Sequence, residues 1–257
     1  MITSTSNPRV KRVRALQTRR SEREQEHAFV IEGIRLAREA VRAQVPARLV
    51  FHTEQIDARG RGLVNSLARL GAEIQVVTPA IMAACSATES PPGLLAVVDL
   101  PQRPLPSPLT FALVIDGLGD PGNLGTILRS AWASGVEAIF LSDGTVDPFN
   151  PKVVRAGMGS HFDLPLCSFA GDQLPEALAG MSLWVAQART GLHYASVDWR
   201  TPIAILIGSE AEGPRPELRR RATGLVQIPM RREAESLNAA VAASILLFEV
   251  LRQRGQP

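Results

Sequence analysis

The stretch IDGLGDPGNLGTILRSA (residues 115–131) contains the pattern Gly117-x-Gly119-x-x-Gly122 between a strand-like run, FALVID, and a helix-like run. The next strand-like run, AIFLSD, ends in Asp143, about twenty residues after the glycines. A dinucleotide-binding βαβ unit has this arrangement, with its glycines beside the pyrophosphate and its acidic residue on the ribose. The stretch therefore raises the hypothesis of a nucleotide cofactor bound over the glycine loop.

The residues that follow the glycines argue against this hypothesis. Their helical period predicts a helix from Leu124 to about Ser134, with Asp120 or Asn123 as its cap. In a dinucleotide fingerprint the third glycine lies inside the helix, whose amides face the pyrophosphate. Pro121 has no N–H to offer a phosphate, and Asp120 would place a negative charge beside it. The glycine loop is therefore expected to serve another function.

Length and composition indicate a globular protein. The chain has 257 residues, of which 45% are hydrophobic, enough for one large or two modest domains. Its two cysteines, Cys85 and Cys167, lie far apart, and the N-terminus has no secretory signal. The longest apolar run, residues 239–248, is well short of the roughly twenty residues that cross a bilayer. We therefore expect a soluble, cytoplasmic protein with reduced thiols and no membrane segment.

Basic residues crowd the start of the chain, although its formal net charge is only +3. The first 23 residues contain a single acid and seven basic residues: Arg9, Lys11, Arg12, Arg14, Arg19, Arg20 and Arg23. This charge favours a polyanion partner, and we expect Arg9, Lys11 and Arg12 to contact RNA. From charge alone, the alternative is a solvated, helix-favouring arm. Aromatic residues make up 5% of the chain, which argues against a base-stacking platform.

Strand-like and helix-like runs alternate along both halves of the chain. In the first half we expect strands at residues 29–31, 48–52, 73–77 and 94–100 and helices at about 34–44, 63–70 and 79–84. In the second half we expect strands at 111–116, 138–142, 164–169, 182–188, 202–208 and 225–230 and helices at about 124–134, from 150, at 172–179, around 216 and at 236–253. This alternation predicts an α/β fold with right-handed crossovers and a mainly parallel sheet.

A proline-rich connector, PQRPLPSPLT, separates the two halves and has four prolines in eight positions. Such a composition favours an extended and fairly stiff linker. We therefore expect a small α/β domain at residues 1–100, a linker at 101–109 and a larger domain at 110–257.

Three separated segments of the second half resemble one known set of motifs. DPGNLGTILRSAWASGV (120–136), ILIGSEAEGP (205–214) and VQIPMRREAESLNAAVAASILLFE (226–249) resemble, in order and spacing, motifs 1, 2 and 3 of the SpoU (TrmH-like) branch of the SPOUT-class RNA methyltransferases. VDPFNPKVVRAGMGSHFDLPL (146–166) also has the look of that family. The first hundred residues, including NPRVKRVRALQ and FVIEGIRL, are similar to the small substrate-binding domain often fused ahead of it.

The resemblance implies a fold and a reaction. The fold is a SPOUT α/β knot, a mainly parallel sheet whose C-terminal segment forms a deep trefoil knot, preceded by a small α/β domain of the L30e-like kind. The cofactor is S-adenosylmethionine, bound at the knot, and the methyl acceptor is a ribose 2′-hydroxyl of RNA. Knots are strongly disfavoured topologies, so periodicity and composition alone do not suggest one.

The resemblance also assigns cofactor-binding residues. From motifs 2 and 3 we expect the cofactor to be bound by Gly208, Gly213, Ile228, Met230, Ser236 and Leu237. An uncharged adenine needs apolar walls and a few fixed polar groups, and residues of this kind supply both. For Ile228 and Leu237, ordinary core packing is the alternative.

The same resemblance gives Arg129, Glu210, Asn238 and Asn123 as the catalytic set. We expect Arg129 to grip the target phosphate and stabilise charge on the 2′-oxygen, because a guanidinium is a poor base. An activated arginine base is the alternative role. Glu210 is expected to orient Asn238 or hold loop amides, and a general base is its alternative role. Asn238 and Ser236 are expected to open the last helix, where such residues commonly act as caps.

The last helix, SLNAAVAASILLFEVLRQ, is apolar around nearly its whole circumference. A helix of this kind has to be covered on all sides. We therefore expect a homodimer formed through the C-terminal domain, as is usual in the family the motifs resemble.

Two other features carry weaker expectations. The four histidines are scattered, without Cys or carboxylates at ligand spacing, so we expect no metal site. Lys152 and Arg155 follow the helix start Asn150-Pro151 and are candidate RNA-phosphate contacts, with a solvated helix face as the alternative.

The motifs leave the RNA target open between ribosomal RNA and tRNA. A fused substrate domain with an arginine-rich start favours a structured ribosomal RNA. Two rival hypotheses are an oxidoreductase or an ordinary Rossmann-type methyltransferase, both using Gly117, Gly119 and Gly122. A third is an RNA-binding protein without catalysis, against which the intact Arg129, Glu210 and Asn238 argue.

Replacing Asp143 separates the rival hypotheses. Asp143→Asn should cripple a Rossmann-type enzyme, because that carboxylate would bind the cofactor ribose, and should only mildly affect an enzyme of the SpoU kind. Steady-state methylation kinetics provide the measurement, and loss of nearly all activity would favour the Rossmann hypotheses.

Overall fold

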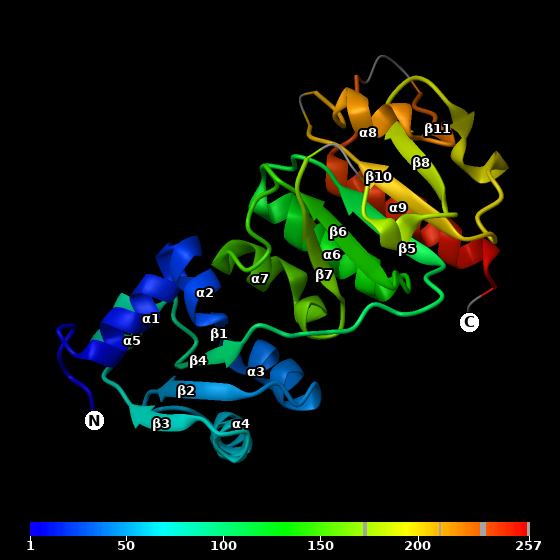
Figure 1. The fold of residues 1–257 in the computed structure, drawn as a ribbon. Helices are drawn as coiled ribbons and strands as arrows, with labels where there is room; N and C mark the ends of the chain where they lie inside the picture. The colour runs from blue at the N-terminus through cyan, green and yellow to red at the C-terminus, as the bar shows by residue number, and fades with distance from the viewer. Residues whose placement is uncertain (172–173, 211, 232–234, 256–257) are drawn as a thin grey trace. The chain divides into compact units, whose positions relative to one another are not determined.

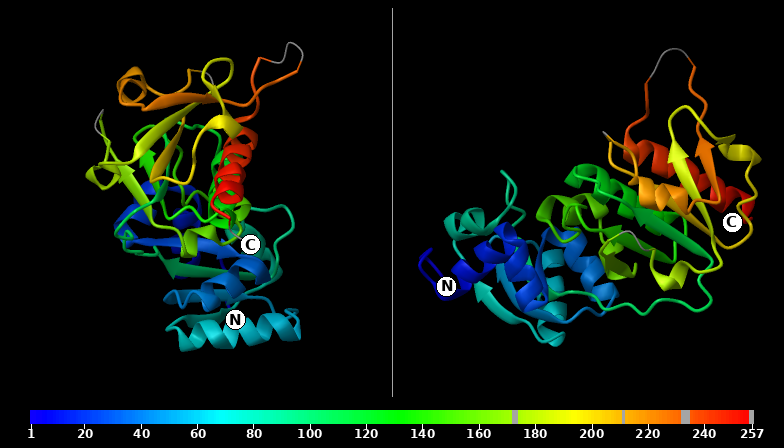
Figure 2. Two further views of the ribbon diagram at one scale, coloured as in Figure 1. Left: turned by 90° about the vertical axis from the view of Figure 1, so that its right-hand side faces the viewer. Right: turned by 45° about the horizontal axis from the view of Figure 1, so that its top comes forward.

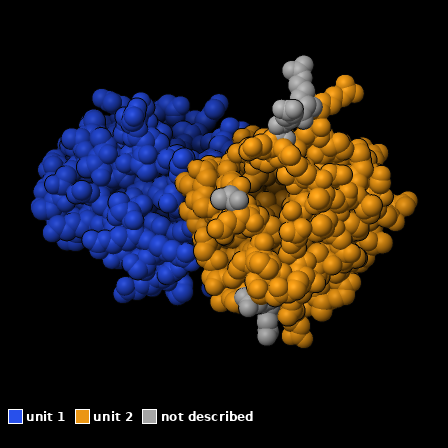
Figure 3. Space-filling model, turned by 90° about the horizontal axis from the view of Figure 1, so that it is seen from above, with its two compact units in different colours: residues 1–102, 147–163 blue, residues 103–146, 164–257 orange. Residues whose placement is uncertain are grey.

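A computed structural model of the chain describes residues 1–171, 174–210, 212–231 and 235–255. The chain forms two compact units, and Figure 3 shows each in its own colour. Unit 1 consists of residues 1–102 and 147–163, and unit 2 of residues 103–146 and 164–257. The division after residue 102 falls within the proline-rich connector. Segment 147–163, which chain order places in the second domain, belongs to unit 1.

Unit 1 is built on a four-stranded sheet in the order β1-β4-β2-β3 (Figure 1). Its strands are β1 (Ala28–Glu32), β2 (Ala47–His52), β3 (Glu73–Val76) and β4 (Leu94–Asp99). β2 and β3 are parallel, whereas β4 is antiparallel to both of its neighbours. Alternate strand residues point to opposite faces, and both faces are buried. One face is covered by α3 (Gly33–Arg42) and α4 (Ala58–Arg69), and the other by α1 (Pro8–Thr18) and α5 (Pro79–Cys85).

The basic start of the chain is a packed helix, so the solvated-arm alternative is wrong. Val10, Val13 and Leu16 of α1 are fully buried against the sheet. Their spacing places them on one face of α1, with the basic side chains on the remaining surface. A short helix, α2 (Arg20–Glu26), follows.

Segment 147–163 contributes to the core of unit 1 through α7 (Pro151–Gly157) and a 3₁₀ turn, η1 (Ser160–Phe162). Val154 and Phe162 belong to the apolar cluster that contains Phe29. Arg23 forms a nearly buried ion pair with Asp147, with Nη2 2.5 Å from Oδ2. Two opposite charges can be buried together in this way because each compensates the charge of the other.

Unit 2 contains a seven-stranded sheet in the order β7-β6-β5-β10-β8-β11-β9. Its strands are β5 (Phe111–Ile115), β6 (Ala138–Ser142), β7 (Leu166–Phe169), β8 (Ser182–Gln187), β9 (Leu192–His193), β10 (Ile203–Ile207) and β11 (Gly224–Gln227). Every neighbouring pair is parallel, which confirms the predicted α/β class and sheet type.

Helices cover both faces of the unit 2 sheet. α6 (Pro121–Ala133) and α9 (Ala239–Gln253) pack side by side on one face (Figures 1 and 2). Leu218 of α8 (Pro216–Arg220) and Leu178 of the 3₁₀ turn η2 (Glu176–Leu178) join the apolar cluster on the other. A further 3₁₀ turn is η3 (Tyr194–Ser196).

Several predicted helix bounds are wrong. α4, expected near residues 63–70, begins at Ala58, because Asp57 caps it. α6 begins at Pro121 rather than Leu124, because Asp120 caps it and proline is favoured at the first helical position. Gly122 therefore lies inside the helix, contrary to the expectation. α9 begins at Ala239 rather than at Ser236, since Asn238 is its cap. Within the predicted helix at 172–179, the described residues form only the η2 turn; residues 172–173 lie outside the described residues.

Among the described helices, none combines the length and the apolar character needed to cross a membrane.

Candidate active site

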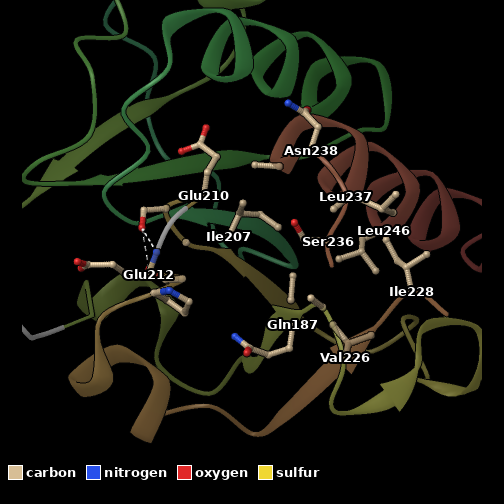
Figure 4. A pocket seen from close by; sticks show the side chains of 18 of the residues that line it. Gln187, Ile207, Glu210, Glu212, Val226, Ile228, Ser236, Leu237, Asn238 and Leu246 are labelled. Carbon is tan, nitrogen blue, oxygen red and sulfur yellow. Dashed lines mark hydrogen bonds between the residues drawn. The ribbon is translucent and has the colours of Figure 1, made fainter. Parts of the chain in front are cut away.

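A cavity of about 430 Å³ opens at the carboxyl ends of three parallel strands of unit 2 (Figure 4). The chain leaves β8, β10 and β11 here, and the start of α9 closes the remaining side. Open α/β sheets commonly bind ligands at the carboxyl edge of their strands, because loops and helix ends supply polar groups there. Both the volume and the position are those of a small-molecule site.

Predicted cofactor residues from motifs 2 and 3 line this cavity: Gly208, Gly213, Ile228, Met230, Ser236 and Leu237. Val226 and Leu246 add further apolar surface to the wall that holds Ile228 and Leu237. Leu237 is 36% exposed, so core packing does not account for it. The cavity thus has an apolar wall on the α9 side and a glycine-containing loop opposite.

The two arms of the glycine-containing loop lie too close together to leave room for a side chain at its first position, Gly208. A Cβ built on Gly208 would lie 2.0 Å from the backbone nitrogen of Pro214. Gly213 has a φ of +71°, a conformation that favours glycine. These two positions explain why the loop requires glycine at both ends.

Three predicted catalytic residues are joined by hydrogen bonds at the cavity edge. Asn238 Nδ2 donates to Asn123 Oδ1 over 2.9 Å, and Asn123 Nδ2 donates to Glu210 Oε1 over 2.7 Å. Asn238 and Glu210 both line the cavity, whereas Asn123 lies in the first turn of α6 and bridges them. Residues from three distant parts of the sequence therefore form one chain of polar contacts.

The direction of each hydrogen bond in this chain is fixed by the start of α9. Asn238 Oδ1 accepts from the backbone N–H groups of Ala240 and Val241, at 2.9 and 3.3 Å. Its Nδ2 must therefore point outward as a donor, which makes Asn123 Oδ1 the acceptor. Asn123 Nδ2 is then the donor toward Glu210, whose Oε1 accepts the bond.

Arg129 lies on α6 outside the cavity lining. Its side chain is exposed, and no hydrogen bond or ion pair joins it to another described residue. α6 packs against α9, and Ser130 Oγ lies 2.8 Å from Ser244 Oγ at their contact. Arg129 is therefore an available cation on the helix that carries Asn123.

Gly117 and Asp143 are engaged in contacts within the protein. The Gly117 N–H donates to Ser142 Oγ at 3.1 Å and Thr145 Oγ1 at 3.2 Å, so it is occupied. Asp143 pairs with Arg215, Nη1 to Oδ1 at 3.0 Å. None of the three glycines of the pattern lines the 430 Å³ cavity. These contacts argue against the Rossmann hypotheses.

The predicted RNA contacts other than Arg129 all belong to unit 1. Arg9 is paired with Glu73 at 2.7 Å and Arg12 with Glu26 at 2.5 Å. Lys11 and Lys152 are exposed. Arg155 is half-buried, with Nη1 buried and without a hydrogen-bond partner among the described residues. Lys11 and Lys152 are therefore more available to a phosphate than Arg9 and Arg12.

Some residues of the site were not expected from the sequence. Gln187 and Glu212 line the cavity, and Asp116 binds Arg215 beneath the glycine-containing loop. Each lies outside the motif positions carried over from the family. The one sequence feature that could have drawn attention to any of them is the position of Asp116 next to the glycine pattern. No His, Cys, Asp and Glu cluster suited to a metal occurs among the residues that the structure describes.

Comparisons with known proteins agree with the geometry. The profile of the SpoU rRNA Methylase family matches residues 110–248, and that of the MRM3-like substrate binding domain matches residues 7–96. The chain is 31% identical to 23S rRNA (guanosine(2553)-2'-O)-methyltransferase RlmP of Bacillus subtilis, covering 97% of this chain and 98% of that protein. It is 30% identical to 23S rRNA (uridine(2479)-2'-O)-methyltransferase of Streptomyces viridochromogenes, covering 98% and 92%. The AdoMet-bound rRNA methyltransferase from Sinorhizobium meliloti superposes with a TM-score of 0.87 at 29% identity, covering 98% and 97%.

Two substitutions at Asn238 separate its roles as cap and as donor. Asn238→Ala should lower the free energy of unfolding by about 1 kcal/mol, because the N–H groups of α9 lose their acceptor. Asn238→Asp keeps an acceptor and should retain nearly all of that stability, although it cannot donate to Asn123. Urea unfolding measures both, and equal destabilisation by the two substitutions would contradict the capping role.

Proposed function

We infer the function from one premise: the chain belongs to the SpoU rRNA Methylase family. We propose that it transfers a methyl group from S-adenosylmethionine to a ribose 2′-hydroxyl of RNA. Ribosomal RNA is favoured over tRNA, because the full-length relatives named above are 23S rRNA enzymes. The observation that carries the proposal is the junction of Asn123, Glu210 and Asn238 at the edge of the cavity.

The cavity suits S-adenosylmethionine. Its volume of about 430 Å³ lies within the roughly 300–1,000 Å³ range of small-molecule pockets. Ile228, Leu237 and Leu246 offer apolar surface for an adenine ring, and the backbone at Gly208, with its N–H and C=O groups, lines the same cavity. The sulfonium is a cation, and Glu210 and Glu212 line the same cavity. The cofactor supplies an electrophilic methyl group.

The residues around the cavity assist the 2′-hydroxyl by position and charge. In our proposal Arg129 binds the phosphate next to the target ribose and stabilises negative charge on the 2′-oxygen. The 2′-hydroxyl proton passes to water as the oxygen bonds the methyl carbon and the bond from that carbon to sulfur breaks, which leaves S-adenosylhomocysteine. Its exposure and lack of a partner among the described residues support this role, because an arginine held by a carboxylate is less available to phosphate. Glu210 holds Asn123, and Asn123 holds Asn238, so the amide groups keep one orientation.

Unit 1 is proposed to bind the RNA. Residues 7–96 match a substrate binding domain, and this range includes the exposed Lys11 and Arg14 on α1. Phosphate contacts of this kind position an RNA without reading its sequence. Lys152 remains a second proposed contact, and Arg9 and Arg12 would have to leave Glu73 and Glu26 to contribute.

A homodimer through unit 2 is part of the proposal. Val241 and Phe248 are 48% and 45% exposed and, seven residues apart, lie on one side of α9. Large apolar side chains exposed on one side of a helix favour a second protein surface. Light scattering at micromolar concentration should give twice the monomer mass of 27.7 kDa, and a monomer would contradict this part.

The trefoil knot and a cytoplasmic place of action also stay predictions.

Replacing Arg129 tests the proposed reaction. Arg129→Ala should lower 2′-O-methylation by about 100-fold or more, because a preorganised charge is lost at the reacting oxygen. Binding of S-adenosylhomocysteine, measured by calorimetry, should be nearly unchanged. Arg219→Ala, which removes another exposed arginine of unit 2 on α8, is the matched control and should retain activity.

The assay maps 2′-O-methyl groups in ribosomal RNA and tRNA from a deletion strain complemented with each variant. A single ribosomal nucleotide should lose its methyl group in the deletion strain and regain it with the wild type. Full activity of Arg129→Ala would end the assignment of that residue, and loss of a tRNA methyl group instead would overturn the preference for ribosomal RNA.

A further inference from the structure

The loop that carries Glu210 is a tight hairpin, defined by residues 208–210 and 212–215 and called the Glu210 hairpin below. Ser209 and Gly213 exchange two backbone hydrogen bonds, Ser209 N to Gly213 O at 3.2 Å and Gly213 N to Ser209 O at 3.0 Å. The close contact of Gly208 with Pro214 draws the two arms together. The hairpin leaves the sheet at the end of β10, and Arg215 is its last residue before α8.

Arg215 is held twice by one buried carboxylate. Its backbone N–H donates to Asp116 Oδ2 over 2.7 Å, and its Nε donates to Asp116 Oδ1 over 2.9 Å. Asp116 follows the last residue of β5, is 2% exposed, and also accepts from Ser142 Oγ over 2.7 Å. A buried carboxylate needs a compensating cation, and Arg215 is that cation. Bonds from both backbone and side chain fix the position and the rotation of the hairpin's base.

The ion pair between Arg215 and Asp143 holds the hairpin less firmly than the contacts with Asp116 do. Asp143 Oδ1 lies 3.0 Å from Arg215 Nη1, but the Asp143 side chain is 56% exposed. Exposed ion pairs contribute little because water screens them. Burial lowers the pKa of Arg215, yet the two carboxylates together outweigh this effect and raise it, so the guanidinium stays charged. Asp116 is therefore the partner that holds the hairpin, and the loss of Asp143 should be tolerated.

We propose that Arg215 is a positioning residue for the methyl transfer, holding the Glu210 hairpin on Asp116 so that Glu210 reaches Asn123 and the cavity keeps its wall. The proposal rests on the proposed function, since it concerns the same site. The hairpin contributes Gly208, Glu210 and Gly213 to the cavity, and its far side meets α6 through the 2.7 Å bond from Asn123 to Glu210. The hairpin is thus fixed at its base by Arg215 and at its far side by Glu210.

This arrangement has a consequence for kinetics. A shift of about 1 Å in a positioned group costs up to roughly 100-fold in rate. Loss of the Arg215 anchor should therefore lower kcat and weaken cofactor binding, because both depend on the hairpin. The KM for RNA should be nearly unchanged, since Arg215 makes no contact with the proposed phosphate ligands Arg129 and Lys11.

The test uses the full chain and three variants. Arg215→Gln removes the guanidinium, Arg219→Gln is the matched control on α8, and the pair Asp116→Asn with Arg215→Gln removes both charges of the ion pair. For Arg215→Gln we expect kcat to fall about 10- to 100-fold, with the KM for RNA within about twofold of the wild type. The dissociation constant of S-adenosylhomocysteine should rise severalfold. Arg219→Gln should match the wild type in all three quantities.

The paired variant separates positioning from stability. Because it leaves no unpaired buried charge, it should recover most of the thermal midpoint lost by Arg215→Gln, yet kcat should stay low. Recovery of kcat together with the midpoint would overturn the proposal, and so would a folded Arg215→Gln variant with the wild-type kcat. If Arg215→Gln does not fold, the paired variant alone decides between these outcomes. A wild-type protein that methylates no RNA would instead refute the proposed function.

Discussion

The N–H groups at the start of α9 have no partner within the helix, and Asn238 satisfies two of them with its amide oxygen. That contact leaves the amide nitrogen facing outward and sets the direction of the bonds to Asn123 and Glu210. An ordinary helix cap thereby orients the whole chain of hydrogen bonds. The chain links α9, α6 and the Glu210 hairpin, which are three of the elements around the candidate active site.

The parallel sheet explains why these elements meet. β5, β10 and β8 are neighbours, so the loops that leave their carboxyl ends gather at one edge. The loop after β5 leads into α6, and that after β10 forms the Glu210 hairpin. Asp116 follows β5 directly and holds Arg215 at the base of the hairpin. The same edge therefore supplies both the cavity and the contacts that keep its wall in place.

The sequence predicted the elements better than the contacts between them. Most of the strands and helices, the parallel sheet and the cavity-lining motif residues followed from periodicity and from the family's motifs, whereas β9 was not predicted and the expected helix at 172–179 was wrong. The apolar period alone placed the start of α6 at Leu124. Asp120, one of the two caps that the sequence offered, sets the start three residues earlier, with Pro121 at the first helical position. The pairing of Asp116 with Arg215 joins residues far apart in sequence and has no local signal. The place of segment 147–163 in unit 1 depends likewise on long-range packing of Val154 and Phe162.

The central claim is that the methyl donor binds at the carboxyl edge of β8, β10 and β11, away from the glycine pattern. A crystal structure of the protein with S-adenosylhomocysteine tests it most directly. The account predicts electron density for the adenosyl group between Gly208, Ile228 and Leu237. Density over Gly117, Gly119 and Gly122, with the ribose on Asp143, would contradict it.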